Sequence, residues 1–326
     1  MFGLKLKFRN WLFKFKIKKN YERVAFEVKD RSWKKTILGF IIKSLILLFF
    51  GMIIIFPFYL MIVVGLSSDD LVRDPRSPIL WPDSWNFNNF SRVLADGEYW
   101  IALLSSAFIT ALSVILKLFF TMTFGYAFSL RKWRFKRLIW AFYLSILILP
   151  ESALLLGQYR VVTILQWNKS DDVKTLISLV TPYVASIFSG YMFKNAFEAI
   201  PDRIKESALI DGCSGFKFFF KVAIPLVKPT IWTVTILTSF AAWNSFLWPR
   251  LLLGDKPGLF SVINLWVLNQ GFDQLSDKNS AAQSSLANLR MIAAILAIIP
   301  MFIVYFIFRR QIINAVGKRG NNTIKG

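Results

Sequence analysis

The most chemically specific stretch of the sequence is ESALIDGCSGFKFFFKVAIPL, residues 206–226. Two acids, Glu206 and Asp211, stand on a predicted short helix, and two glycines bracket the single cysteine, Cys213. A short helix that presents carboxylates and apolar side chains suits insertion into a groove of another protein, with an ion pair to that partner. The residue types therefore predict a binding element rather than a catalytic centre.

The composition removes several kinds of chemistry from the whole chain. With no histidine among 326 residues, histidine-based acid–base catalysis, serine–histidine triads and histidine-ligated metal sites are excluded. No G-x-x-x-x-G-K-[ST] phosphate loop occurs, so the chain is not expected to hydrolyse ATP itself. One cysteine also rules out an internal disulfide.

Hydrophobic segments long enough to cross a bilayer surround residues 206–226. The chain is 55% hydrophobic, and several stretches reach the ~20 apolar residues that a crossing needs. Helices are the expected form, since unpaired backbone groups are too costly in lipid. We predict six spans, at about 37–66, 101–130, 138–158, 174–194, 229–249 and 290–308.

The distribution of lysine and arginine predicts the orientation of these spans. With the N-terminus in the cytoplasm, the inner segments hold 28 basic residues and the outer segments hold 9. This asymmetry follows the positive-inside rule. The net charge of +21 then faces cytoplasm and anionic lipid, and no nucleic-acid partner is expected.

Three parts of the chain are predicted from these patterns. Residues 1–35 form a basic cytoplasmic arm, either an amphipathic helix on the inner leaflet or a retention signal without defined structure. Residues 36–313 form the six-helix membrane domain, and residues 314–326 a cytoplasmic tail. The first outer loop is expected to be ordered and partly interfacial, with a short helix near 87–95.

The inner loop at residues 194–228 is predicted to contain two short helices joined by a turn, at about 201–225. Pro201 suits the first position of the first helix, and Asp202 places a negative charge at its positive end. Ile204, Ala208 and Leu209 recur at helical spacing and predict a short apolar face. Gly212 is expected to end the helix in a left-handed conformation.

This loop resembles the signature of ABC importer permeases: E-A-A, three residues, G, nine residues, I, one residue, L-P. The matching positions are Glu206-Ser207-Ala208, then Gly212, then Val222, Ile224 and Pro225, with Ser207 in place of alanine. ILWPDSWNFNNFSRVL, FGYAFSLRKWRFKR and AAWNSFLWPRLLL are also similar to segments of maltose-type carbohydrate permeases. The resemblance covers residues 37–326 and is strongest to the shorter subunit of the permease pair.

The resemblance implies an all-α membrane protein in the cytoplasmic membrane of a prokaryote, with both termini inside. It would form a heterodimeric pore with a second permease subunit, above two cytoplasmic ATPases that bind ATP and magnesium, while this chain holds no cofactor. An extracytoplasmic solute-binding protein would deliver a carbohydrate, expected to be an oligosaccharide. Glu206 would pair with an ATPase arginine, Ala208 would keep the helix slim, and Asp211 would lie beside the turn at Gly212.

Two groups of intramembrane residues are candidates for the translocation path. Lys117 in the second span would line the path or pair with Glu151 in the third, and snorkelling or a structural ion pair is the alternative. Asn244 and Ser245 lie beside Trp243 in the fifth span, where amides and aromatic rings suit sugar recognition. Helix–helix hydrogen bonding and interfacial anchoring explain the same residues.

Three other functions are weighed against the importer. A secondary transporter would need membrane-embedded carboxylates, and Glu151 is the only acid deep in a predicted span. A membrane enzyme would need a catalytic set, and the predicted spans contain no carboxylate pair. A permease-like sensor without flux would differ from an importer only in a transport measurement.

Overall fold

A computed structural model describes residues 33–73, 78–95, 97–130, 133–167, 172–254, 260–270 and 286–317. Within these ranges the chain is helical and contains no strand, which confirms the predicted all-α membrane fold. The basic arm falls almost wholly outside them, and so do residues 318–326 of the tail. The proposed structure of the arm therefore stays a prediction.

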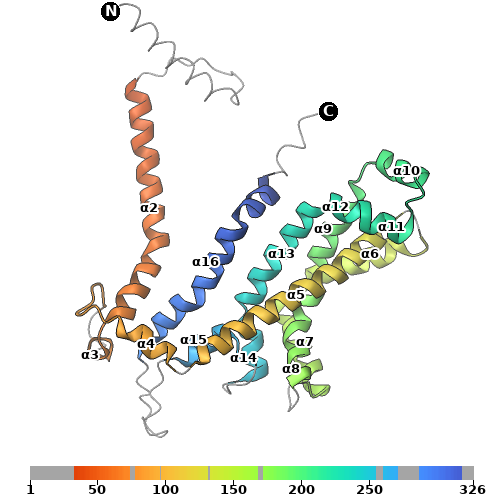
Figure 1. Ribbon diagram of the computed structural model, residues 1–326. Coiled ribbons are helices and arrows are strands. Elements are labelled where there is room, and N and C mark those ends of the chain that lie inside the picture. The colour runs from red at the N-terminus through yellow and green to blue at the C-terminus, as the bar shows by residue number, and fades with distance from the viewer. Residues whose placement is uncertain are drawn as a thin grey trace, which may run out of the picture. The chain divides into compact units, whose positions relative to one another are not determined.

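The chain divides into two compact units, residues 1–58 and residues 59–326. The described part of the first unit is the beginning of helix α2 (Trp33–Leu66), an apolar helix whose large side chains are mostly exposed. The second unit contains the end of α2 and all the other described helices (Figure 1).

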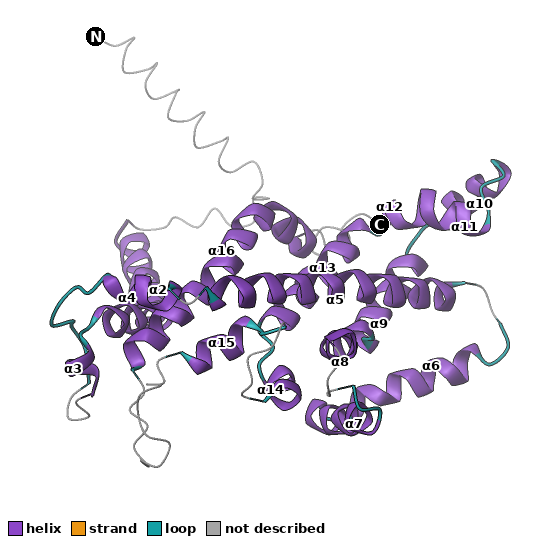
Figure 2. Ribbon diagram, turned by 60° about the horizontal axis from the view of Figure 1, so that its bottom comes forward, coloured by secondary structure: helices purple, strands orange, loops and turns teal. Residues whose placement is uncertain are grey.

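Three of the described helices are long and apolar enough to cross a membrane unbroken. They are α2, α5 (Glu98–Ser129) and α16 (Ala287–Gly317). In α5 the end near Glu98 is here called the outer end, and the end near Ser129 the inner end. Figure 2 shows the short helices α3 (Asp69–Arg73) and α4 (Asn88–Leu94) near the outer end, and α10 (Asp202–Ile210) and α11 (Gly215–Phe218) near the inner end.

The third and fourth predicted spans are bent rather than straight. Helix α6 (Lys136–Ser145) and the 3-10 turn η1 (Ile146–Ile148) precede a bend of 102° into α7 (Glu151–Ile164). The span predicted at about 138–158 is thus broken near its middle, where Pro150 lies in extended backbone at the bend. Helices α8 (Asp172–Val184) and α9 (Ile187–Glu198) meet at 51°.

The fifth span, predicted at about 229–249, is helix α13 (Lys228–Trp243), which ends before the predicted residue 249 and follows a bend. A bend of 74° separates α11 (Gly215–Phe218), the π-helical turn η2 (Phe219–Ala223) and α12 (Ile224–Leu226) from α13 (Lys228–Trp243). Helix α14 (Leu247–Leu253) follows a break at residues 244–246, and α15 (Ile263–Asn269) precedes α16. Six crossings result if each bent pair is counted as one span.

Helix α5 is the centre of the second unit, packing along α8, α9 and α13. Gly125 permits the close approach to α9, because a Cβ there would lie 2.6 Å from the Cβ of Phe193. The buried stripe of α5 is partly polar and includes Ser106, Ser113 and Lys117. This helix therefore connects the outer end of the unit to its inner end.

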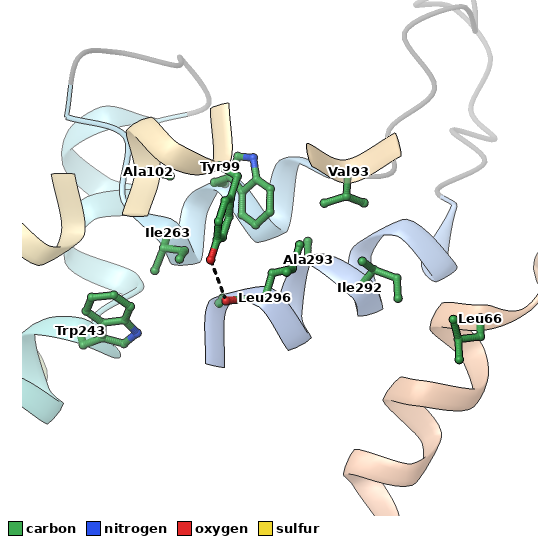
Figure 3. Close-up of a cluster of buried hydrophobic side chains, with 11 residues drawn as sticks. Leu66, Val93, Tyr99, Ala102, Trp243, Ile263, Ile292, Ala293 and Leu296 are labelled. Atoms are coloured by element: carbon green, nitrogen blue, oxygen red, sulfur yellow. Dashed lines mark hydrogen bonds between the residues drawn. The ribbon is translucent and has the colours of Figure 1, made fainter. Parts of the chain in front are cut away.

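The outer end is closed by a buried apolar cluster. Tyr99, Trp266 and Ile292 pack together there, and the Tyr99 hydroxyl donates to the Leu296 carbonyl at 3.4 Å (Figure 3). Gly65 belongs to this packing, because a Cβ at its position would lie 2.8 Å from the Ile292 side chain. The last turns of α2 thus pack directly against α16.

A set of polar side chains, here called the outer clasp, joins the ends of α2, α4 and α16. Asn89 and Asn288 are fully buried, and each amide donates to the Ser67 carbonyl, at 3.2 and 3.1 Å. Asn288 also donates to Asp69 at 2.7 Å, and Arg92 binds both oxygens of that carboxylate at 3.0 and 3.1 Å. The hydrogen bond from Arg92 holds the pKa of Asp69 below its ordinary value.

Candidate functional site

The inner loop is built on helix α10 (Asp202–Ile210), which confirms the predicted short helix. Pro201 is the residue that caps this helix and lies just outside it, so its predicted place at the first helical position is wrong by one. Its carbonyl accepts the N–H of Ile204 at 3.0 Å. Asp202 opens the first turn as predicted and forms an ion pair with Lys205 at 3.0 Å.

The C-terminus of α10 ends in a Schellman turn. The Gly212 N–H donates to the Leu209 carbonyl at 3.1 Å, and the Cys213 N–H donates to the Ala208 carbonyl at 2.7 Å. Gly212 has a φ of +65°, the left-handed conformation that the sequence predicted. These bonds satisfy the last carbonyls of the helix without any other element, so the turn is determined locally.

The faces of α10 differ from the predicted apolar stripe. Ala208 is only 7% exposed and faces its own chain, so it does not lie on the surface that a partner would contact. Leu209 and Ile210 are 62% and 87% exposed, because they follow Ala208 on the other side of the helix. Glu206 is also exposed, and its carboxylate forms no ion pair within the described ranges.

Beyond the turn, a buried phenylalanine attaches the loop to the membrane helices. Phe219, in the π-helical turn η2, is 5% exposed and packs on Tyr126 of α5, with ring centroids 4.6 Å apart. Phe197 of α9 lies 5.3 Å from Tyr126 and 6.0 Å from Phe219. This aromatic triad joins the loop to α5 and α9, whereas Phe216 and Phe220 are 84% and 62% exposed.

A cavity of about 490 Å³ lies between α10 and the inner ends of α5 and α9. Aromatic side chains, including Tyr126, Phe197 and Phe218, line it together with Glu206 and Lys205. An acid beside aromatic rings is an environment that accepts the side chain of an arginine or lysine. The cavity therefore places the Glu206 carboxylate beside aromatic rings, with Lys205 and its ion-pair partner Asp202 also at the lining.

Lys117 lies on the buried stripe of α5 and is 8% exposed. Its own chain thus covers most of this side chain, and among the described residues no carboxylate pairs with it. Glu151 is the first residue of α7, directly after the bend at Pro150, and its side chain is outside the described set. The predicted pairing of Lys117 with Glu151 stays a prediction.

The polar residues predicted in the fifth span lie at the break after α13. Trp243 is 7% exposed and packs in the outer cluster, so its ring is not available to stack on a sugar in this conformation. Asn244 is exposed and Ser245 half-buried. The Asn264 amide donates to the carbonyls of Trp243 and Ser245, at 2.8 and 3.0 Å, and so stabilises the break.

Several residues that position the site were missed by sequence reasoning. The run Phe218-Phe219-Phe220 gives no indication of which ring faces inward, because the π-helical turn changes the usual helical spacing there. Asn264 was missed because its partners are backbone carbonyls about 20 residues away in the sequence. Only the tertiary contacts identify these positioning residues.

The chain is similar along nearly its whole length to proteins of one transport family. Residues 28–318 match the family described as binding-protein-dependent transport system inner membrane component. The "probable ABC transporter permease protein MG189" of Mycoplasma genitalium is 54% identical over 328 residues, covering all of both chains. The arabinooligosaccharides transport system permease protein AraQ of Halalkalibacterium halodurans is 26% identical and covers 81% of this chain and 90% of its own.

A solved structure has the same fold. It is the crystal structure of a bacterial ABC transporter involved in the import of the acidic polysaccharide alginate. The match has a TM-score of 0.68 and 22% identity, and it covers 88% of this chain and 99% of that chain. At this level of identity the likeness supports the architecture alone.

Proposed function

Because the chain belongs to the family of binding-protein-dependent transport system inner membrane components, we propose that it is a pore-forming permease subunit of an ATP-driven carbohydrate importer. In this proposal it pairs with a second, related permease subunit. Two cytoplasmic ATPases bind ATP and magnesium beneath the pair, and an extracytoplasmic solute-binding protein delivers the substrate. Both termini lie in the cytoplasm, in keeping with the distribution of basic residues.

The structure of the inner loop is the observation that carries the proposal. Glu206, Leu209 and Ile210 are exposed beside a cavity, while Phe219 fixes the same loop to α5 and α9. An exposed binding face on a well-anchored segment is suited to receive a force from one protein and pass it to another. We assign the exposed face to an ATPase cleft, with Glu206 as the partner of an arginine there.

The proposed cycle is alternating access. ATP binding closes the two ATPases, and the inner loop moves with the cleft that holds it. Since the aromatic triad joins the loop to the inner ends of α5 and α9, these helices tilt with it and the pore opens outward. Ser207 and Asp211 lie on the exposed part of this element, and Pro225 precedes the bend into α13.

The proposed substrate is an oligosaccharide, which is the substrate class named for the arabinooligosaccharide permease relative. Asn244, exposed at the break after α13, is the proposed sugar contact of this chain, and Ser245 lies beside it. Lys117 would act on the path only after the surrounding helices separate, because its own chain covers it in the described conformation.

The experiment that tests the proposal compares Glu206→Lys with wild type and with a matched control, Asp172→Lys. Asp172 is also an exposed acid in the first turn of a helix, but it belongs to α8, away from the inner loop. Each chain is purified from its native membranes in a mild detergent. The co-purifying proteins are identified, and ATP hydrolysis and vesicle uptake are assayed.

We expect wild type and Asp172→Lys to retain a second permease and an ATPase, and Glu206→Lys to lose the ATPase or its substrate-stimulated hydrolysis. A bound solute-binding protein would then be used to identify the sugar. A chain that purifies alone and moves solute without ATP would overturn the importer proposal and favour a secondary transporter.

A further inference from the structure

The described residues before α4, 78–87, run alongside the last turns of α2. The Tyr59 hydroxyl donates to the Leu80 carbonyl at 2.6 Å, and the Asn86 N–H donates to the Leu66 carbonyl at 2.8 Å. Between these points the Ser68 N–H donates to Asp83 at 3.1 Å, and its hydroxyl bonds the other oxygen of that carboxylate. These bonds tie the loop to the outer part of α2 over a defined length.

The hydrogen bond between Tyr59 and Leu80 lies beside the membrane-crossing part of α2. Tyr59 precedes the last residue of α2, Leu66, by seven positions, which corresponds to about 10 Å along the helix axis at 1.5 Å per residue. Helical side chains also lean toward the N-terminus, here away from the outer end. The Leu80 backbone therefore lies several ångströms from the outer end of α2, toward the middle of the span. The chain reaches the outer end again at Asn86, whose N–H donates to the Leu66 carbonyl.

The side chains of this returning segment are large, apolar and exposed. Leu80, Trp81, Trp85 and Phe87 are 56, 67, 52 and 64% exposed. The two indole rings meet edge to face with centroids 5.8 Å apart. Asp83 is the single ionisable residue in the segment; it is exposed, and its carboxylate accepts hydrogen bonds from the backbone N–H and the hydroxyl of Ser68. We call residues 80–87 the outer aromatic loop.

We propose that the outer aromatic loop inserts into the lipid leaflet at the outer end of the first span, with Trp81 and Trp85 at the boundary between headgroups and acyl chains. Tryptophan prefers this depth because its ring is apolar and its N–H needs a polar partner. The loop also continues the apolar surface of α2, where Ile62 is 47% exposed close to Tyr59. The headgroup boundary suits the loop as a whole, because its large apolar side chains can face the acyl chains while the exposed carboxylate of Asp83 stays at headgroup level.

The consequence is a fixed depth for the outer end of the first span. The loop is attached through Asp83 and Asn86 to residues that adjoin the outer clasp, so lipid contacts at Trp81 would resist movement of the clasp along the membrane normal. Transport cycles would then move the inner loop while the outer part of α2 stays at one depth. This function does not depend on what the transporter carries.

The single cysteine makes a direct depth measurement practicable. Cys213→Ser gives a cysteine-free background, into which Trp81→Cys, Trp85→Cys or Leu80→Cys is introduced for nitroxide labelling. Ser91→Cys on α4 is the matched aqueous control, since Ser91 is exposed, and Ile62→Cys is the lipid control. The labelled chain, purified with its associated subunits, is reconstituted into phosphatidylcholine–phosphatidylglycerol vesicles. Collision rates with oxygen and with a neutral nickel chelate are then compared.

We expect labels at positions 80 and 81 to collide more with oxygen than with the nickel chelate, as at position 62, and the label at 91 to show the reverse. High nickel accessibility at 80, 81 and 85 would place the loop in water and overturn the proposal. Low accessibility to both reagents would indicate a protein partner, and would overturn it equally. Three labelling positions keep the test available if one variant does not assemble, and the readout is independent of transport activity.

Discussion

The outer and inner ends of the second unit differ in how their side chains are buried and hydrogen-bonded. At the outer end, the buried amides of Asn89 and Asn288 bond to backbone and side-chain oxygens, and the apolar cluster around Trp266 is enclosed. At the inner end, Leu209, Ile210 and Phe216 remain exposed, and Leu209 also lines the cavity beside α10. Among the described residues, the polar bonds of the outer clasp are therefore completed within the chain, whereas the inner loop leaves its apolar side chains uncovered.

The contrast between the outer clasp and the inner loop indicates that the inner loop is the part that needs a partner surface. A polar group that is buried without a hydrogen bond is costly, so the bonds made by the amides of Asn89 and Asn288 stabilise the outer clasp within the chain. Exposed apolar side chains on a short helix gain free energy only when another surface covers them. In the proposed transport cycle, the outer clasp is therefore the part that stays fixed and the inner loop is the contact that moves.

The largest expected effect comes from cutting the attachment of the inner loop. Phe219→Ala removes the central ring of the aromatic triad, and a buried Phe→Ala change typically costs about 3–5 kcal/mol. Hydrogen exchange should become faster across residues 215–226, and transport should fall while ATP hydrolysis persists. Phe220→Ala, an adjacent but exposed phenylalanine, is the control and should change exchange little. Equal effects of the two variants would show that Phe219 is not the anchor.

An intermediate effect is expected from opening the outer clasp. Asn288→Leu leaves the Ser67 carbonyl and the Asp69 carboxylate without the amide, which should cost about 2 kcal/mol. Faster exchange is expected at residues 65–73 and 286–292, with the inner loop unchanged. Asn88→Leu changes the exposed amide next to Asn89 and should leave exchange at both ends as in wild type. Faster exchange of the inner loop in Asn288→Leu would contradict the independence of the two ends.

The smallest effect is a pH dependence confined to the outer end. The pKa of Asp69 is lowered by the hydrogen bond from Arg92, so its ionised form contributes stability above the ordinary value of 3.8. That contribution is lost as pH falls below 3.8 and through the lowered pKa. Exchange at residues 67–73 should quicken over this acid range, and Arg92→Gln should shift the change to higher pH. A pH response that is unaltered by Arg92→Gln would show that the titration of Asp69 does not control the stability of the outer clasp.

The sequence predicted those features that follow from local chemistry. Gly212 ends α10 because a left-handed residue is needed there, and the Schellman bonds span only six residues. The first and last spans were recognised from their apolar length, and α4 from its surrounding turn residues. Positions that depend on distant segments were missed: the break at Asn244 is held by Asn264, and the inward face of α10 is Ala208 rather than Leu209.

The sequence by itself determined the class of the protein, because apolar length, basic-residue asymmetry and a spaced loop motif are properties of neighbouring residues. Tertiary structure alone decided which of three consecutive phenylalanines anchors the inner loop, and which asparagines are buried in the clasp. Burial is a property of surfaces brought together from distant parts of the chain. A side chain's sequence position sets what it can bond to, and packing sets whether it is enclosed with that partner or left exposed for another protein.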